Sequence, residues 1–291
     1  MKKLRNLEKS NEAVAGVIVA ILLLGLILSM IGIIQGLYVP QWSEKKESEH
    51  MGEVAKQFTQ LKFSIDTLSA QGQPYISISN PITLGSEEMP FLASSRAYGN
   101  INIKSDSFKV TFNNSNCEEE IHLGSIEYSS SNSYYLDKSY IFESGALILS
   151  QARGNIMIIN PQFIVVNDNE IIFNLVKIIE SGETSVSGYG TCPIQTEFVQ
   201  STPLLLNDDV NQLNYVEKIN ITTEHKKAWK KMLEDTLPDD SEDLLNYTIT
   251  EYDDGVELKF IQDTSPEVAD IYPRISSNIV EIKVKISQTL K

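Results

Sequence analysis

Residues 13–39 read AVAGVIVAILLLGLILSMIGIIQGLYV, an uncharged apolar stretch that begins a dozen residues from the N-terminus. At about 1.5 Å per residue, a helix over this stretch is roughly 40 Å long, which exceeds the roughly 30 Å of hydrocarbon in a bilayer. The stretch therefore predicts a transmembrane helix that crosses with some tilt. A secretory signal peptide is the alternative, but this apolar core is about twice the usual signal length and no small-residue cleavage pattern follows it.

Charges on the two sides of this stretch predict its orientation. Four basic residues lie in the leader, residues 1–12, whereas the two lysines just after the stretch are offset by three glutamates between positions 44 and 49. The positive-inside rule then places the leader in the cytoplasm and everything after Pro40 outside the cell membrane. Tyr38 and Trp42 fall at the exit, where amphipathic rings prefer the headgroup layer.

The overall charge excludes one class of partner. The 291 residues carry a formal net charge of −15, and because the leader contributes +2, the remainder carries −17. Such a surface repels nucleic acid and anionic lipid, so neither is expected as a main ligand. The length beyond the span is enough for one large or two small folded domains.

Two cysteines, Cys117 and Cys192, both lie beyond the span. Disulfides persist outside the cell, so one bridge between them is predicted, with two buried free thiols as the alternative. Closing a loop of about 75 residues would stabilise the fold by about 4 kcal/mol. The chain has no CxxC motif and no His/Cys cluster, so a structural zinc site is not expected.

Residues 43–72 are predicted to form an amphipathic stalk helix. Its apolar residues recur at alternating spacings of three and four, as in three heptads: Met51, Val54, Phe58, Leu61, Ile65 and Leu68. The stripe can pack on the globular domain or on another copy, and the domain is expected because three heptads make a weak isolated coiled coil. Gly72 is expected to end the helix and Pro40 to kink its junction with the span.

Residues 73–291 are predicted to form a mainly β domain, an antiparallel sandwich or meander. Residues 101–104, 108–112 and 280–286 alternate apolar and polar side chains, while 141–149, 156–166 and 171–179 are continuous apolar runs expected as core strands. Asp254-Gly255 between two alternating runs predicts a hairpin. One inserted helix is expected near residues 223–236, with Thr223 as its N-cap.

The inserted helix carries a basic strip in an otherwise acidic protein: Lys226, Lys227, Lys230 and Lys231. This strip could meet an acidic neighbouring subunit or an envelope polymer. The alternative is a solvated helix face.

No motif for catalysis or cofactor binding is present. The three histidines, His50, His122 and His225, lack partners at motif spacing and are expected at the surface. Acidic clusters at 167–170, 207–209 and 239–243 lack the register of a calcium-binding EF-hand and are expected as solvated loops. Three sequons, at Asn113, Asn220 and Asn246, are candidate glycosylation sites. We therefore expect no enzyme, no cofactor and no metal.

The N-terminus carries a family resemblance. The segment EAVAGVI at residues 12–18, directly behind a short basic leader, resembles the start of archaeal type IV pilin-like proteins. The stalk around His50 and the segments at 81–85 and 139–145 are similar to uncharacterised secreted archaeal proteins with this layout. The resemblance implies a leader peptidase that cuts between Ser10 and Val14, and partnership with other pilin-like subunits. It also implies a structural, assembly or adhesion role at the cell surface.

Small residues in the span have the spacing that lets helices approach closely: Gly16 and Ala20, and Gly32 and Gly36. They are candidates for helix packing in self-association. Two other hypotheses stay open. The first is an anchored ectodomain that binds an envelope glycan, peptide or partner protein. The second is an extracytoplasmic hydrolase, which would require a pocket where a histidine meets a carboxylate and a hydroxyl.

Overall fold

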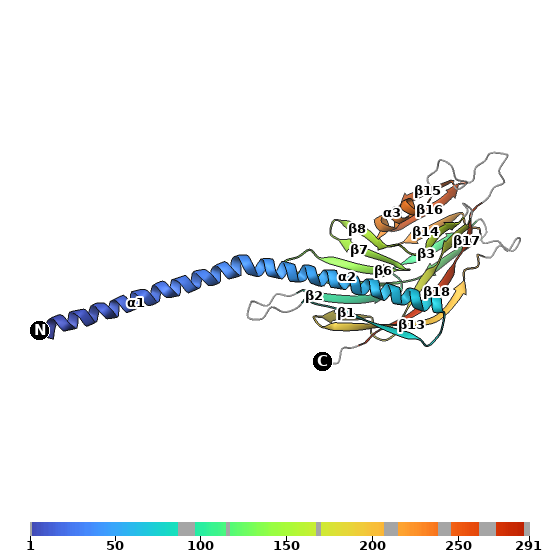
Figure 1. Ribbon diagram of the computed structural model, residues 1–291. Helices are drawn as coiled ribbons and strands as arrows, with labels where there is room; N and C mark the ends of the chain where they lie inside the picture. The colour runs from blue at the N-terminus through green and yellow to red at the C-terminus, as the bar shows by residue number, and fades with distance from the viewer. Residues whose placement is uncertain are drawn as a thin grey trace.

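A long helical rod opens the structure (Figure 1). Helix α1 (Lys2–Ile33), the π-helical segment η1 (Ile34–Tyr38) and helix α2 (Val39–Gln71) follow one another without a break. The computed structural model describes residues 2–86, 97–114, 117–166, 170–206, 215–237, 246–261 and 272–287, with side chains from Val14 onward. The α1 end projects away from the strands, whereas α2 lies along them.

The rod changes direction where α1 passes into α2, as predicted from Pro40 (Figure 1). Proline has no N–H and its ring displaces the carbonyl group four residues earlier, so a regular α-helix cannot continue unchanged. The π-helical segment absorbs this mismatch, and the N–H of Val39 donates to the carbonyl oxygen of Ile34, five residues back. Gly72 ends α2 in the left-handed region with a φ of 59°, as the sequence predicted.

The prediction of a mainly β domain is confirmed, but the described strands form four sheets and not the two of a simple sandwich. The first sheet contains β1 (Ser77–Thr83), β13 (Thr191–Pro203), β18 (Asn278–Ile286) and β11 (Leu175–Glu180), in that order. The second contains β12 (Ser185–Gly188), β2 (Tyr98–Lys104), β5 (Ser125–Ser131), β6 (Lys138–Glu143), β7 (Ala146–Gln151) and β8 (Gly154–Ile159).

The third sheet contains β15 (Asn246–Glu251), β16 (Gly255–Ile261), β14 (Lys218–Thr222), β3 (Lys109–Asn113) and β4 (Glu118–His122). The small fourth sheet contains β17 (Arg274–Ser276), β10 (Glu170–Phe173) and β9 (Phe163–Val166). Pairing is antiparallel except between β10 and β17 and between β11 and β18, which are parallel. The hairpin expected at Asp254-Gly255 joins β15 to β16.

The three continuous apolar runs, expected as core strands, do form strands with buried residues, but each run is divided into two strands by a turn. Residues 141–149 bend at Ser144 and Gly145, whose φ angles of 45° and 85° suit a tight hairpin turn between β6 and β7. Residues 156–166 divide into β8 and β9 around Pro161, and residues 171–179 divide into β10 and β11 at Asn174. A single turn residue is enough to end a strand inside an apolar run.

Buried apolar side chains form two clusters in the described part of the chain. One lies among the third and fourth sheets, one face of the second sheet and helix α3 (Lys226–Thr236), around Trp229 and Phe108. The other lies between α2, the first sheet and the opposite face of the second sheet. Neighbouring residues on β6 therefore serve different clusters, Ile141 the first and Phe142 the second.

Helix α2 is a core element of the β domain. All six residues of the stripe are at most 1 % exposed: Met51, Val54, Phe58, Leu61, Ile65 and Leu68. The stripe packs on its own domain, so these six residues are not available for a coiled coil with another copy.

The predicted disulfide is absent, because Cys117 and Cys192 are both free thiols. Cys117 precedes β4 in the third sheet and is partly exposed, whereas Cys192 lies on β13 in the first sheet and is fully buried. The two sheets pack around different clusters, which separates the thiols. Burial raises the pKa of the Cys192 thiol to about 11, with a smaller contribution from Glu183, so this thiol is protonated and unreactive at neutral pH.

Candidate functional site

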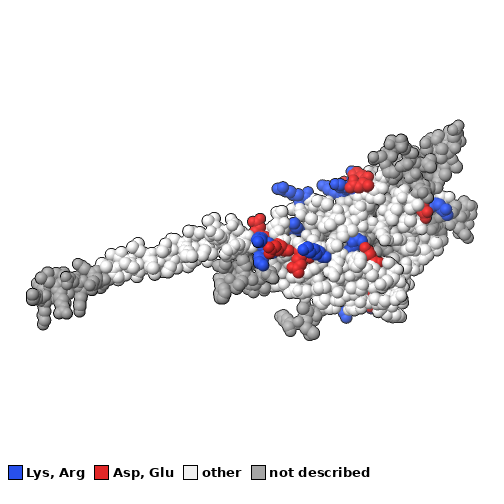
Figure 2. Space-filling view, viewed as in Figure 1, with Lys and Arg blue, Asp and Glu red and all other residues white. Residues whose placement is uncertain are grey.

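The apolar helix is exposed along its length. From Val14 to Tyr38 no side chain is buried, and Leu22, Leu26 and Met30 are 67, 70 and 64 % exposed. Figure 2 shows no charged side chain along this part of the rod. Within the described residues it is the one helix long and apolar enough to cross a membrane. A core helix of a soluble protein would bury this surface, so the segment is a candidate membrane anchor.

The four small residues predicted for helix packing lie on this exposed helix. A Cβ atom added at Gly16, Gly32 or Gly36 would meet nothing within 4 Å, so these positions contact no part of the β domain. Their surfaces are open to lipid or to a neighbouring helix.

Glu47 attaches the start of α2 to the second sheet. Its side chain is 1 % exposed, and its carboxylate accepts three backbone N–H groups from the loop between β5 and β6. The donors are Ser133 at 3.0 Å, Tyr134 at 2.8 Å and Tyr135 at 2.7 Å. Such charge-assisted bonds hold the loop and the helix in one geometry.

His50 was expected at the surface, and this prediction is wrong because the side chain is buried. Its Nε2 atom lies 3.2 Å from the carbonyl oxygen of Leu84 and 3.0 Å from the hydroxyl of Tyr128, and that hydroxyl donates to the same carbonyl at 2.8 Å. Burial lowers the pKa of His50 and outweighs the opposing effects of Leu84, Glu53 and Glu47. A neutral histidine therefore ties α2 to the β domain.

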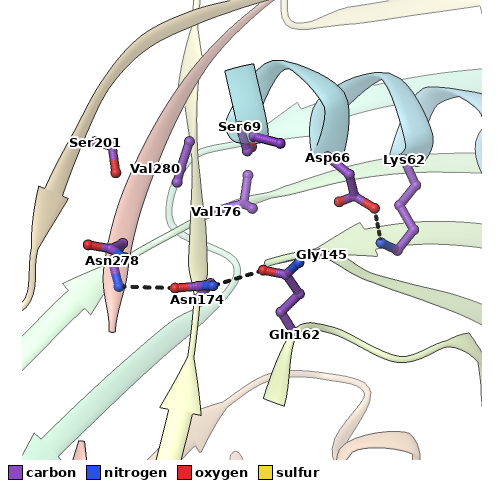
Figure 3. A pocket seen from close by; sticks show the side chains of 11 residues that line it. Lys62, Asp66, Ser69, Gly145, Gln162, Asn174, Val176, Ser201, Asn278 and Val280 are labelled. Carbon is purple, nitrogen blue, oxygen red and sulfur yellow. Dashed lines mark hydrogen bonds and ion pairs between the residues drawn. The ribbon is translucent and has the colours of Figure 1, made fainter. Parts of the chain in front are cut away.

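A polar cavity of about 190 Å³ lies beside the second half of α2 (Figure 3). On one side Lys62 pairs with Asp66 at 2.5 Å. Opposite lies a chain of amides in which Asn174 donates to the Gln162 side chain at 2.8 Å and accepts the backbone N–H of Asn278 at 3.3 Å. The cavity thus offers amide donors and acceptors on one side and a charged pair, compensated within itself, on the other, an arrangement that can bind a polar group of no net charge.

A second polar cluster surrounds Glu143, which lies at the end of β6 and is 2 % exposed. Its carboxylate accepts the Trp229 indole N–H at 2.8 Å, contacts Nδ1 of His225 at 2.8 Å and accepts the Thr223 hydroxyl at 3.0 and 3.1 Å. Burial alone would lower the pKa of His225, but the hydrogen bond and charge of Glu143 raise it overall.

This cluster corrects two expectations from the sequence. His225 is only 12 % exposed at its side chain and is not a surface residue, whereas His122 is exposed beside Asp106 and Glu120, as expected. Thr223 does not cap the helix end directly. It accepts the His225 N–H at 2.9 Å, and α3 begins after His225.

A histidine, a carboxylate and a hydroxyl thus meet, as the hydrolase hypothesis required. The geometry is nevertheless unsuited to nucleophile activation, in which the hydroxyl must bond to the imidazole base. Here the Thr223 hydroxyl donates to Glu143, and both side chains are at most 3 % exposed. The contacts join β6 to α3 within the core.

Two of the four lysines of the basic strip contact other groups of the β domain. Lys226 donates to the carbonyl oxygens of Tyr252 and Asp253 at 2.7 and 3.3 Å, and Lys230 lies 3.9 Å from Glu234. Lys227 and Lys231 are exposed. Lys226 also lies 3.7 Å from Glu251, so the strip adjoins opposite charge. Figure 2 shows basic and acidic side chains close together on the visible face of the β domain.

The asparagines of the three sequons differ in their exposure to solvent. Asn246 is exposed at the start of β15, whereas Asn113 and Asn220 are half-buried within β3 and β14. The side-chain oxygens of Asn113 and Asn220 are buried without a partner.

The acidic clusters at 207–209 and 239–243 and most of 167–170 lie outside the described residues. Among the described residues no group of three or more acidic, histidine or cysteine side chains could hold a metal.

Fold and site together define an exposed apolar helix whose continuation, α2, packs in the core of a mainly β domain. Residues 13–260 match the model of the Family of unknown function (DUF7289), and the chain belongs to this family. None of the curated proteins matches the sequence. No solved structure matches it either.

Proposed function

We propose that this protein is a membrane-anchored cell-surface protein, pilin-like at its N-terminus, with a structural, assembly or adhesion role. One observation carries the proposal: no side chain of the apolar helix is buried from Val14 to Tyr38, while its direct continuation α2 buries one face against the β domain. A bilayer around α1 supplies the missing apolar environment. The charge difference across the span favours an extracellular β domain.

The resemblance of residues 12–18 to archaeal pilin-like leaders extends the proposal to processing. A leader peptidase would cut between Ser10 and Val14 and leave the apolar helix on the mature chain. That helix presents Gly16, Ala20, Gly32 and Gly36 to the helices of other pilin-like subunits.

The test uses the membrane fraction of cells that produce the full chain with a C-terminal tag. N-terminal sequencing is expected to start between residues 11 and 14, and protease added to intact cells is expected to digest the tag. A start at Met1 contradicts the pilin-like leader. A protected tag, or protein in the soluble fraction, contradicts the surface anchor itself.

A second candidate function, recognition of an envelope glycan, is favoured by the cavity of Figure 3. Amide side chains pair well with the hydroxyl groups of sugars because each amide offers both a donor and an acceptor. Replacing Asn174 by Leu removes the central amide, so binding on an envelope glycan array should be lost. Asn246→Leu on exposed β15 is the matched control, and equal binding by both variants contradicts a glycan role for the cavity.

A further inference from the structure

The loop between β5 and β6, residues 132–137, presents two apolar side chains to solvent although its backbone is held firmly. Tyr134 is 41 % exposed and Leu136 is 67 % exposed. Within the loop, Asn132 donates its backbone N–H to Asp137 and its side-chain amide to the Leu136 carbonyl oxygen, both at 2.8 Å. The three bonds to Glu47 then attach the loop to α2. Exposed Tyr and Leu on so constrained a loop indicate a contact surface.

The position of this loop along the helix brings it to the exit of the apolar segment. Glu47 follows Trp42 by five residues, which is about 7.5 Å of helix. Side chains of a helix tilt toward its N-terminus, so the loop bonded to Glu47 lies on the α1 side of that residue. In Figure 1, β6 starts at the end of the β domain that faces α1.

The helix side of this region already has the character of a membrane interface. Tyr38 and Trp42 are each 48 % exposed, and their rings lie 5.9 Å apart at the end of the apolar segment. The headgroup layer on each side of the hydrocarbon is about 5–8 Å thick. A loop attached about 7.5 Å beyond Trp42 and directed back toward it therefore reaches this layer.

We propose that the β5–β6 loop is a second membrane contact, in which Tyr134 and Leu136 enter the headgroup layer of the leaflet that α2 leaves. Leu136 offers an apolar contact and Tyr134 an amphipathic one. Neither contact requires anionic lipid, which would repel a chain of net negative charge. It rests on the proposed anchoring by α1. Its consequence is a fixed orientation of the β domain, because a single span alone leaves the domain free to tilt.

The test places a spin label on the full chain in phosphatidylcholine vesicles, with Cys117→Ser to remove the partly exposed thiol. Labels at positions 24, 136 and 205 are compared by their collision rates with oxygen, which concentrates in lipid, and with a water-soluble nickel chelate. Leu136 and Leu205 are matched, at 67 and 65 % exposed, and Leu205 follows β13. The ratio of oxygen to nickel collisions should be highest at 24, several-fold lower at 136, and lowest at 205.

The outcomes separate this inference from the anchor. A lipid-like ratio at 24 with a water-like ratio at 136 overturns the second contact and leaves the anchor standing. A water-like ratio at 24 overturns the anchor.

Glu47→Gln tests the part that Glu47 plays in this contact. In this variant the ratio at position 136 should fall toward the ratio at 205, because the carboxylate no longer holds the loop, and the ratio at position 24 should stay unchanged. Glu49→Gln, whose side chain is 54 % exposed, is the matched control and should leave position 136 unchanged. An unchanged ratio at 136 in Glu47→Gln contradicts the part assigned to Glu47.

Discussion

At the scale of single residues, two buried acids join helices to strands, and neither is recognisable from local sequence. Glu47 accepts three backbone N–H groups from residues 133–135, and Glu143 accepts donors from Thr223, His225 and Trp229. Their partners lie 80 to 88 positions away in the chain. Carboxylates so far from their donors look like ordinary surface acids in an acidic sequence.

Glu47→Ala should destabilise the domain by about 2–3 kcal/mol, because three backbone N–H groups of the β5–β6 loop lose their charged acceptor. Urea unfolding of the detergent-solubilised protein measures the change. Glu49→Ala, on the same helix and half-exposed, should stay within about 0.5 kcal/mol of wild type. Equal effects of the two substitutions would show that the Glu47 contacts contribute nothing specific.

His225 predicts a pH dependence. Because its folded-state pKa is raised, its protonated form stabilises the fold fully below the unfolded pKa of about 6.5, and this contribution disappears as pH rises through the folded pKa. The difference between the urea midpoints of wild type and of His225→Asn should therefore decrease as the pH rises from weakly acidic to alkaline. His50 acts in the opposite sense, since its pKa is lowered, but it is common to both proteins and cancels. A difference that does not change with pH excludes His225 as its source.

At the scale of elements, α2 combines two roles: a continuation of the apolar rod and a wall of the β core. The heptad stripe was recognisable because helical periodicity is local, and all six stripe residues are buried. His50, one position before the stripe, was missed because its partners Leu84 and Tyr128 come from other elements.

Two phenylalanines of α2 make a matched test of this packing. Phe58 is 1 % exposed between Tyr128 and Tyr140, whereas Phe63 is 70 % exposed. Phe58→Ala should cost about 3–5 kcal/mol, from lost apolar burial and the cavity left behind. Phe63→Ala should cost less than about 0.5 kcal/mol. Thermal or urea unfolding checks both, and similar losses would contradict the packing of α2 on the sheets.

The exposed face of α1 predicts dependence on lipid. Leu22→Arg with Leu26→Arg places two charges in the middle of the span, at about 2.5–3.5 kcal/mol each on an insertion scale. The double variant should leave the membrane fraction, whereas Leu205→Arg, at a similarly exposed position in the β domain, should remain in it. Fractionation followed by immunodetection measures this, and retention of the double variant would argue against α1 as the anchor.

At the scale of the whole molecule, the two cores explain the behaviour of the thiols. Because Cys117 and Cys192 are free thiols, the first beside the third sheet and the second within the first sheet, a reductant should leave the unfolding midpoint unchanged. Alkylation under native conditions should modify Cys117 and spare Cys192 until the protein unfolds, since Cys192 is buried and its pKa is about 11. A mass shift of both thiols in the native protein, or a shift in midpoint on reduction, would contradict this arrangement.

The sequence by itself determined the apolar rod, the buried stripe of α2, its end at Gly72, the β-rich composition of the remainder and the hairpin at Asp254-Gly255, because each depends on neighbours a few positions apart. Only the tertiary structure decided which strands pair, that the thiols stay apart, and that Glu47, His50 and Glu143 are buried with partners. It also decided that His225 is largely enclosed and contacts Glu143. The parallel pair of β11 with β18 joins residues about a hundred positions apart. Such pairings depend on how whole faces fill the two cores, and no local pattern encodes that choice.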